Sequence, residues 1–262
     1  MRLQKIRWSL GAAALGGLVV LAACAPWPIT VLHAATAGGV PVRIDQATAH
    51  AGGITRGDAP GFPVTLATPG HYRLASDLVV PADSPGVLIT AAGVTLDLNG
   101  FAIRGPVTCT GQAEAVRCDA QPRHSANGVQ ASAAGAMVRN GSVRGFAGMG
   151  VLLDREGQIE DMQVSDNAGI GVYANTSASR PVQVRRVLAQ RNGADGFWLQ
   201  TGSIEQSRAE QNGRTGFALG ALMTLHESRA SGNKGLDGDA LFAALTTTPT
   251  GRQRETASQT RK

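Results

Sequence analysis

A glycine followed by an apolar residue returns along this 262-residue chain at nearly constant intervals. The pairs are Gly128-Val129, Gly150-Val151, Gly171-Val172, Gly196-Phe197, Gly216-Phe217 and Gly235-Leu236, with steps of 22, 21, 25, 20 and 19 residues. An asparagine shortly precedes each of the last four glycines, at Asn167, Asn192, Asn212 and Asn233. An interval of this length indicates one small structural unit repeated along the chain, so we expect a solenoid.

Two further apolar columns keep nearly the same interval. The first is Val138, Ile159, Val184, Ile204 and Leu225, and the second, five residues later in each unit, is Val143, Val164, Ala189, Ala209 and Ala230. Residues between the glycines alternate apolar and polar, which is the period of a strand and not of a helix. About twenty residues hold two or three short strands, and the leucine-rich repeat pattern is missing. We therefore predict parallel strands stacked about 4.8 Å apart, with turn asparagines hydrogen-bonded in ladders.

Two segments resemble a known family. Residues 94–105 (VTLDLNGFAIRG), with the N-G-x-x-G-F units that follow, resemble right-handed parallel β-helix proteins of the pectate-lyase-like group, and residues 70–80 (GHYRLASDLVV) resemble their first coil. The resemblance implies an all-β, single-stranded right-handed parallel β-helix of about seven to eight coils, with a domain at residues 63–245. That fold carries lyases, hydrolases, epimerases and non-catalytic binders, so it does not identify an activity.

The amino terminus is typical of an exported protein. Three basic residues precede an apolar run, and residues 9–37 contain no Asp, Glu, Lys or Arg. This is the pattern of a secretory signal at residues 1–37, followed by a linker at 38–62. Residues 21–24 (LAAC) resemble a lipobox that would leave Cys24 lipidated, whereas residues 35–37 (ATA) form an ordinary cleavage site. We expect a periplasmic, outer-membrane lipoprotein or secreted protein, which contacts a membrane only through its signal or lipid.

The basic charge lies at the two ends of the chain. The net charge is +5, residues 1–8 carry +3, and residues 251–262 carry another +3, so the remainder is near −1. A folded body without a basic surface excludes nucleic acid as its expected partner. Residues 246–262 are expected to form a disordered basic tail.

Two cysteines fit an oxidising compartment. Cys109 and Cys118 lie in a stretch of small and polar residues, and we expect them to form one disulfide that closes a surface loop.

One strand column carries the candidate binding residues. If the residue after each repeated glycine points inward, Tyr173 and Trp198 point outward on adjacent coils, beside Asp154, Asn175 and Gln200. Aromatic rings flanked by amides and a carboxylate suit stacking against sugar rings, and exposed aromatic patches commonly have partners. The alternative is that a loop, or the Leu241-Phe242 end, covers the two rings.

The neighbouring outward columns are expected to be structural. One reads Arg139, Glu160, Arg185, Glu205, His226, and the next reads Asn140, Asp161, Arg186, Gln206, Glu227. Charges of alternating sign on adjacent strands attract each other, so we expect an ion ladder on a solvated face and not a catalytic site.

Catalytic candidates are few. Asp154 with Arg155 on the aromatic face, and His124 in the cysteine loop, are the available acids and bases. The Asp237-Gly-Asp239 segment could hold calcium, although such a segment more often shapes a turn, and we assign no cofactor or metal.

Two functions follow from these residues. The first is a cell-envelope protein that binds polysaccharide without catalysis. The second is a lyase or epimerase acting on uronic-acid polymers. The segment before Thr65 and residues 239–245 are expected to cap the coil ends, which favours a monomer.

Overall fold

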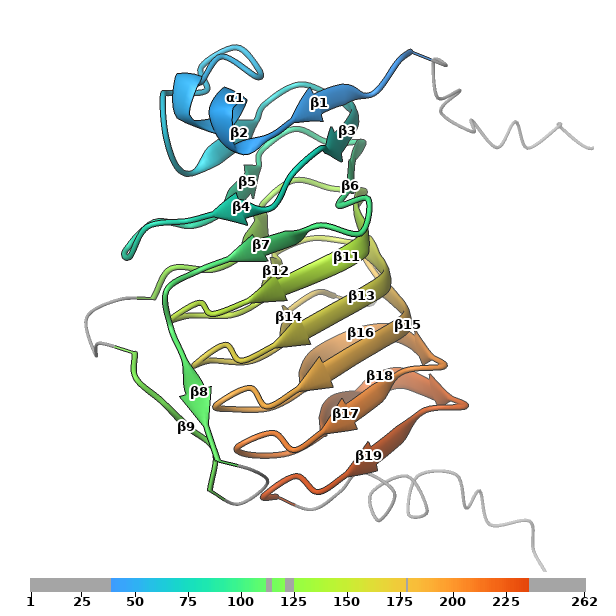
Figure 1. Ribbon diagram of the computed structural model, residues 1–262. Helices are drawn as coiled ribbons and strands as arrows, with labels where there is room; N and C mark the ends of the chain where they lie inside the picture. Colours follow the sequence, from blue (N-terminus) through green and yellow to red (C-terminus); the bar gives the residue numbers. More distant parts are fainter. Residues whose placement is uncertain (1–38, 112–114, 121–124, 178, 236–262) are drawn as a thin grey trace, which may run out of the picture. The chain divides into compact units, whose positions relative to one another are not determined.

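The computed structural model describes residues 39–111, 115–120, 125–177 and 179–235 of the chain. Within them the chain winds as a parallel β-solenoid of about seven turns, and nearly all of its regular structure is strand (Figure 1). Each turn, or coil, contributes up to three short strands, and equivalent strands of successive coils pair in parallel. The predicted all-β solenoid is therefore confirmed.

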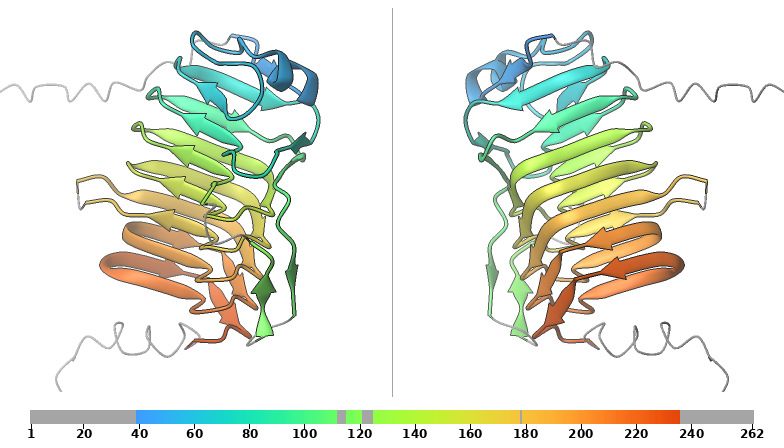
Figure 2. Two further views of the ribbon diagram at one scale, coloured as in Figure 1. Left: turned by 90° about the vertical axis from the view of Figure 1, so that its left-hand side faces the viewer. Right: turned by 90° about the vertical axis from the view of Figure 1, so that its right-hand side faces the viewer.

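The stacked coils present three faces (Figure 2). The first face consists of β2 (Val64–Leu66), β5 (Val87–Ile89), β10 (Val129–Ala131), β12 (Val151–Leu153), β14 (Val172–Ala174) and the first residues of β16 (Phe197–Glu205) and β18 (Phe217–His226). The second consists of β1 (Val42–Ile44), β3 (Gly70–Leu74), β6 (Val94–Asp97), the first halves of β11 (Ala136–Arg144), β13 (Gly157–Ser165) and β15 (Val182–Gln190), and the ends of β16 and β18. The third consists of β4 (Leu78–Val79), β7 (Ala102–Arg104), the second halves of β11, β13 and β15, β17 (Arg208–Glu210) and β19 (Arg229–Ser231).

The three apolar columns of the sequence form the core in the predicted register. Each described member pairs with the next described one along the stack, as in Val151 with Val172, Ile159 with Val184, and Val164 with Ala189, whereas Leu236 lies outside the described residues. Nearly all of them are buried. The repeat interval is therefore the length of one coil, and it varies because the loops between strands differ in length.

The predicted asparagine ladder lies along the corner between the third and first faces. The Nδ2 atoms of Asn167, Asn192 and Asn212 donate to the Oδ1 atom of the next asparagine at 3.0, 3.0 and 2.8 Å, and Asn233 is the last asparagine of the sequence. A Cβ at Gly171 would lie 2.7 Å from the Nδ2 atom of Asn192. The repeated glycine is therefore needed because the ladder of the next coil occupies the space of its side chain.

The segment predicted as a linker, residues 38–62, belongs to the folded body. Its strand β1 pairs with β3, and helix α1 (Gln46–Ala51) lies at the amino-terminal end of the stack (Figure 1). Asp45 caps this helix: its Oδ1 atom accepts from the backbone N–H of Thr48 at 2.9 Å, and this bond lowers the pKa of the carboxyl. Ile44 and Ala49 are fully buried, so the segment covers core that the first coil alone would expose.

The predicted signal at residues 1–37, the lipidation candidate Cys24 and the tail at 246–262 lie outside the described residues. In the part of the chain that is described, no helix is long and apolar enough to cross a membrane.

Candidate functional site

Tyr173 and Trp198 lie side by side on the first face. They occupy equivalent positions in β14 and β16, where the backbone pairs them in register. Their rings are stacked, with centroids 4.7 Å apart and planes inclined by 13°. Both side chains are half-buried, whereas Val172 and Phe197, one residue earlier, are fully buried. The alternation of inward and outward residues thus places the two rings on the surface, as expected.

The stacking determines which parts of the rings a ligand can reach. Nearly parallel rings with centroids one strand spacing apart must overlap face to face, because side by side in one plane they would collide. Tyr173 and Trp198 therefore cover one face of each other and direct their edges outward. This differs from a flat platform, since the remaining ring faces point toward the neighbouring coils.

Different side chains lie next to those remaining faces. Leu152 pairs with Tyr173 on the preceding coil, and Ala218 pairs with Trp198 on the following coil. A leucine covers far more of an adjacent ring than the single methyl of an alanine, so among the described residues Trp198 has the more open outer face.

Three polar side chains flank the pair at one edge of the first face. Asp154, Asn175 and Gln200 each directly follow the paired residues Leu153, Ala174 and Leu199 in successive coils. Asp154 and Asn175 are exposed, and Gln200 is half-buried. None of the three side chains makes a hydrogen bond or ion pair with another described residue. The edge therefore offers two amides and a carboxylate to a ligand.

The catalytic candidates are only partly brought together. Asp154 and Arg155 are exposed at the end of β12, and His124 lies outside the described residues. Sequence reasoning missed Glu156, whose Oε2 atom is buried without a hydrogen-bond partner in the described structure. Alternation of apolar and polar residues could not reveal it, because Glu156 lies in a turn between strands.

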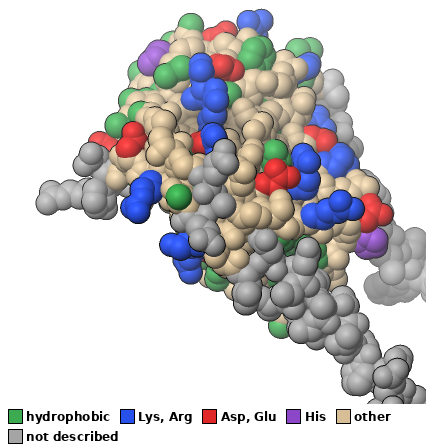
Figure 3. All heavy atoms as spheres, turned by 60° about the horizontal axis from the view of Figure 1, so that its bottom comes forward, with side chains coloured by type: hydrophobic (Ala, Val, Ile, Leu, Met, Phe, Trp, Pro, Cys, Tyr) green, Lys and Arg blue, Asp and Glu red, His purple; other side chains and the backbone are tan. Residues whose placement is uncertain are grey.

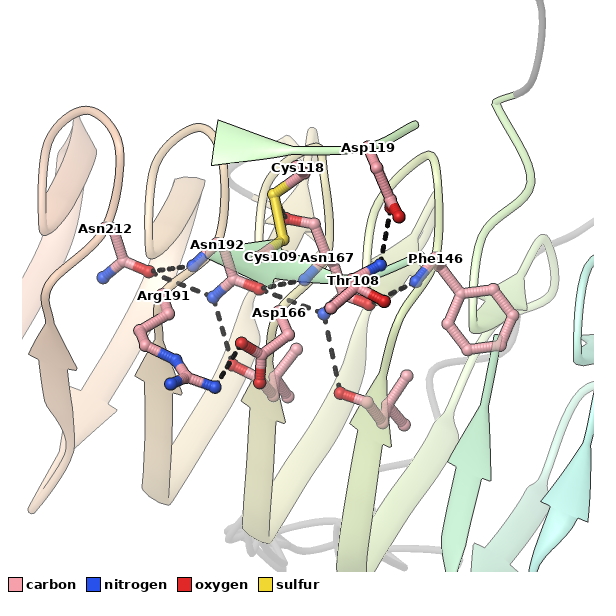
Figure 4. Close-up of a disulfide and its surroundings, with 12 residues drawn as sticks. Thr108, Cys109, Cys118, Asp119, Phe146, Asp166, Asn167, Arg191, Asn192 and Asn212 are labelled. Carbon is pink, nitrogen blue, oxygen red and sulfur yellow. Dashed lines mark hydrogen bonds and ion pairs between the residues drawn. A yellow bond between two sulfur atoms is a disulfide. The ribbon is translucent and has the colours of Figure 1, made fainter. Parts of the chain in front are cut away.

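The expected disulfide is present. Cys109 and Cys118 are joined at an S–S distance of 2.00 Å and connect the antiparallel strands β8 (Cys109–Thr110) and β9 (Arg117–Cys118). This hairpin runs along the stack beside the asparagine ladder, and the Sγ atom of Cys118 lies 3.8 Å from the carbonyl oxygen of Asn167 (Figures 1 and 4). The insertion therefore follows the corner that precedes the first face.

A hollow lies where the insertion that carries the hairpin, residues 106–127, leaves the solenoid. It has a volume of about 180 Å³ and lies among residues 81–84, both ends of the insertion and the ring of Phe146. Its lining includes neither the aromatic pair nor the polar edge. No sequence motif marks it, because its walls come from three separate segments.

The charged columns form the expected ion ladder only in part. Among the described residues no ion pair joins Arg139 to Glu160 or Arg185 to Glu205, and Arg139 pairs instead with Asp97 at 3.5 Å. Arg185 pairs with Glu160 at 3.0 Å, and the guanidinium of Arg186 contacts both carboxylate oxygens of Asp161 at 2.6 and 2.7 Å. The hydrogen bonds from Arg186 lower the pKa of Asp161. At several places on the surface drawn in Figure 3, acidic and basic side chains lie next to one another. These groups are neutralised locally.

The described residues are 39–111, 115–120, 125–177 and 179–235, and they contain no cluster of metal ligands. No three His, Cys, Asp or Glu residues in these ranges lie close enough together to hold an ion. The calcium candidate at Asp237 and Asp239, and the Leu241-Phe242 end considered as a cover for the rings, lie outside the described residues.

Comparison with known proteins identifies no relative, so a proposed function has to be based on the site itself. The chain matches no protein-family model, no curated protein and no solved structure. The structure itself shows the parallel β-solenoid, and the likeness to the pectate-lyase-like group remains a resemblance of two sequence segments.

Proposed function

We propose that this protein is an exported protein of the cell envelope that binds polysaccharide through Tyr173, Trp198 and the polar edge beside them. The observation that carries this proposal is the surface ring stack next to three side chains without partners in the described structure. Sugars present apolar C–H faces and hydroxyls together, and the site offers aromatic surface and hydrogen-bonding groups together.

The rigidity of the solenoid supports a binding role. Both aromatic residues lie on strands paired on both sides, and the residues before and after them are fully buried. A site built on strands loses little conformational entropy when a ligand binds, which favours affinity.

Export is supported by the disulfide and by the sequence of residues 1–37. A structural disulfide such as Cys109–Cys118 persists in oxidising compartments and is rare in the cytosol. We accordingly propose a periplasmic, outer-membrane lipoprotein or secreted location, and a partner in the envelope polysaccharides.

The binding proposal is tested by co-sedimentation with insoluble envelope polysaccharides. We expect Trp198→Ala and Tyr173→Ala each to weaken binding by roughly tenfold, the scale of removing a central aromatic contact. Val79→Ala is the matched control, because Val79 is an apolar residue, 55% exposed, in β4 on the third face, away from the proposed site. Unchanged binding combined with a large loss of stability in Trp198→Ala would show instead that the rings are covered by the fold.

A second candidate function is polysaccharide lyase or epimerase on uronic-acid polymers. It is favoured by Glu156, whose unpaired buried carboxylate oxygen lies two residues from the exposed Asp154. A lyase produces unsaturated chain ends that absorb in the ultraviolet, and an epimerase exchanges the C5 proton with solvent. Catalysis would be supported if the wild type gives one of these two signals and both Asp154→Asn and Glu156→Gln lose it. If the wild type gives neither signal, binding without catalysis is the function that stands.

A further inference from the structure

We infer that one sugar ring stacks on the outer face of Trp198, in a slot bounded by Trp198 and Gln200 on one coil and by Ala218 and Gly220 on the next. This inference rests on the proposed function and specifies where within the site the ligand binds.

The residue beside Trp198 on the next coil is small. The outward position of the first face is occupied, coil by coil, by Thr65, Leu88, Gln130, Leu152, Tyr173, Trp198 and Ala218. Ala218 has the smallest side chain of this column. Since stacking already uses the other face of Trp198, the space above Ala218 is where a further ring can continue the stack.

The side-chain amide of Gln200 lies beside the space above Ala218. Gly220 leaves room for Gln200: a Cβ at Gly220 would lie 2.8 Å from the Oε1 atom of Gln200. The carboxamide of Gln200 therefore reaches across to the coil that carries Ala218. It makes no hydrogen bond to another described residue, so it can bond to a hydroxyl of a ring stacked on Trp198.

The register between β16 and β18 is interrupted close to the same place. β16 and β18 pair regularly up to Leu199 with Leu219, and pairing resumes at Thr201 with Leu222. One extra residue of β18 therefore opposes Gln200, which is a bulge. Bulges change the direction of side chains and occur often beside binding sites. Here the bulge lies beside both Gln200 and the Ala218 position.

Together these features select a pyranose ring with an apolar face. The indole contacts the C–H groups of that face, and the Gln200 amide bonds to a hydroxyl at the ring edge. The plane of such a ring is parallel to the stacked rings of Tyr173 and Trp198, so the sugar chain leaves in the direction of the strands and does not run along the stack. Only one or two sugar units then contact the protein.

The slot is tested by tryptophan fluorescence in the full chain. The sequence has three tryptophans, and Trp8→Phe with Trp27→Phe leaves Trp198 as the only one. The probes are maltose and maltohexaose, cellobiose and cellohexaose, and di- and hexagalacturonate. We expect at least one pair to change the emission saturably, with Kd values for the short and long member within about threefold, since one extra contact of 1.4 kcal/mol would change Kd tenfold.

The inference is decided by comparing the Kd values of variants in which a larger side chain at position 218 fills the slot. Ala218→Leu should raise Kd by roughly tenfold or more, and Ala218→Val should raise it less, whereas Ala218→Gly keeps the slot open and should stay within about threefold. Thermal unfolding by circular dichroism confirms that each variant is folded, and the valine variant replaces the leucine variant if that one is not.

Three results would overturn the inference, and they can be distinguished from one another. If Trp198→Ala abolishes co-sedimentation while both slot-filling variants bind like the wild type, the proposed function stands and the slot is wrong. If Trp198→Ala, Tyr173→Ala and the slot-filling variants all bind polysaccharide like the wild type, both are wrong. A strong increase of affinity from disaccharide to hexasaccharide would show that the ligand runs along the stack.

Discussion

At the scale of single residues, Asn192 shows how strongly neighbouring coils depend on one side chain of the asparagine ladder. Its Oδ1 atom accepts from the backbone N–H and Nδ2 of Asn167 at 3.2 and 3.0 Å, and its Nδ2 atom donates to Val164 O at 3.1 Å and Asn212 Oδ1 at 3.0 Å. Asn167, Asn192 and Asn212 are completely buried. Asn192→Ala would leave the partners of this side chain buried without a hydrogen bond, at a place where water cannot replace the lost amide. We therefore expect it to lower the free energy of unfolding by about 3 kcal/mol or more, measured by denaturant titration.

The control for this substitution is Asn175→Ala. Asn175 is exposed and has no hydrogen-bond partner among the described residues, so its removal should change the free energy of unfolding by less than about 0.5 kcal/mol. Similar losses in the two variants would mean that the ladder contributes no more than a surface amide.

Structural positions that require one residue type at a constant interval could be predicted from the sequence. Positions defined only by backbone or side-chain geometry could not. The asparagine of the ladder, such as Asn192, and the repeated glycine, such as Gly171, return in successive coils. No other side chain continues an amide ladder, and no other residue lacks a Cβ. By contrast, the corner between the second and third faces has a positive φ at Asn140, Asp161 and Arg186, and the residue type there varies from coil to coil. The face-to-face orientation of Tyr173 and Trp198 depends on side-chain torsions, which a pattern of inward and outward residues does not contain.

At the scale of elements, the ion ladder that joins β13 and β15 makes a prediction about pH. Arg186 lowers the pKa of Asp161, so the pair stabilises the fold above the pKa of an unfolded aspartate, about 3.9. This stabilisation is lost as pH falls through the lower pKa of the folded protein. Arg186→Gln should raise the pKa of Asp161 toward its ordinary value, measured by NMR of the carboxyl carbon.

Arg185→Gln is the matched control for that measurement. Arg185 makes its close ion pair with Glu160 and acts on Asp161 only as a more distant charge. Its replacement should therefore move the pKa of Asp161 less than Arg186→Gln does. An equal shift in both variants would mean that the general charge of the column, and not the direct contact, sets the pKa.

The disulfide hairpin is an element whose loss should stay local. Cys109–Cys118 joins β8 to β9 over a separation of nine residues, and these strands pair only with each other. In Cys109→Ser/Cys118→Ser we expect amide hydrogen exchange in β8 and β9 to rise by roughly tenfold or more, because the crosslink no longer restricts their opening. Exchange in β13 and β15 should stay unchanged, and faster exchange there would show that the hairpin holds the coils together.

The elements also show where the sequence pattern ends. The repeat predicted the coils from Gly128 onward, because there each coil differs little from the next. It did not predict β1 and α1, since residues 38–62 carry no repeat and are held by capping and burial at the end of the stack. The disulfide could be predicted from two cysteines, but the course of its hairpin along the ladder depends on contacts between distant segments.

At the scale of the whole molecule, the excess basic charge and the proposed site lie in different parts of the sequence, so specific binding can be distinguished from non-specific binding. The net charge of +5 comes from residues 1–8 and 251–262, whereas the proposed site consists of two aromatic rings, two amides and the carboxylate of Asp154. Stacking and amide hydrogen bonds are not screened by ions, but attraction between a basic segment and an anionic polymer is. We therefore expect the Kd for polysaccharide to change by less than about threefold between roughly 0.05 and 0.5 M NaCl. A chain ending at Thr250 should bind with the same Kd, whereas steep weakening by salt, abolished by that truncation, would assign the binding to the basic end.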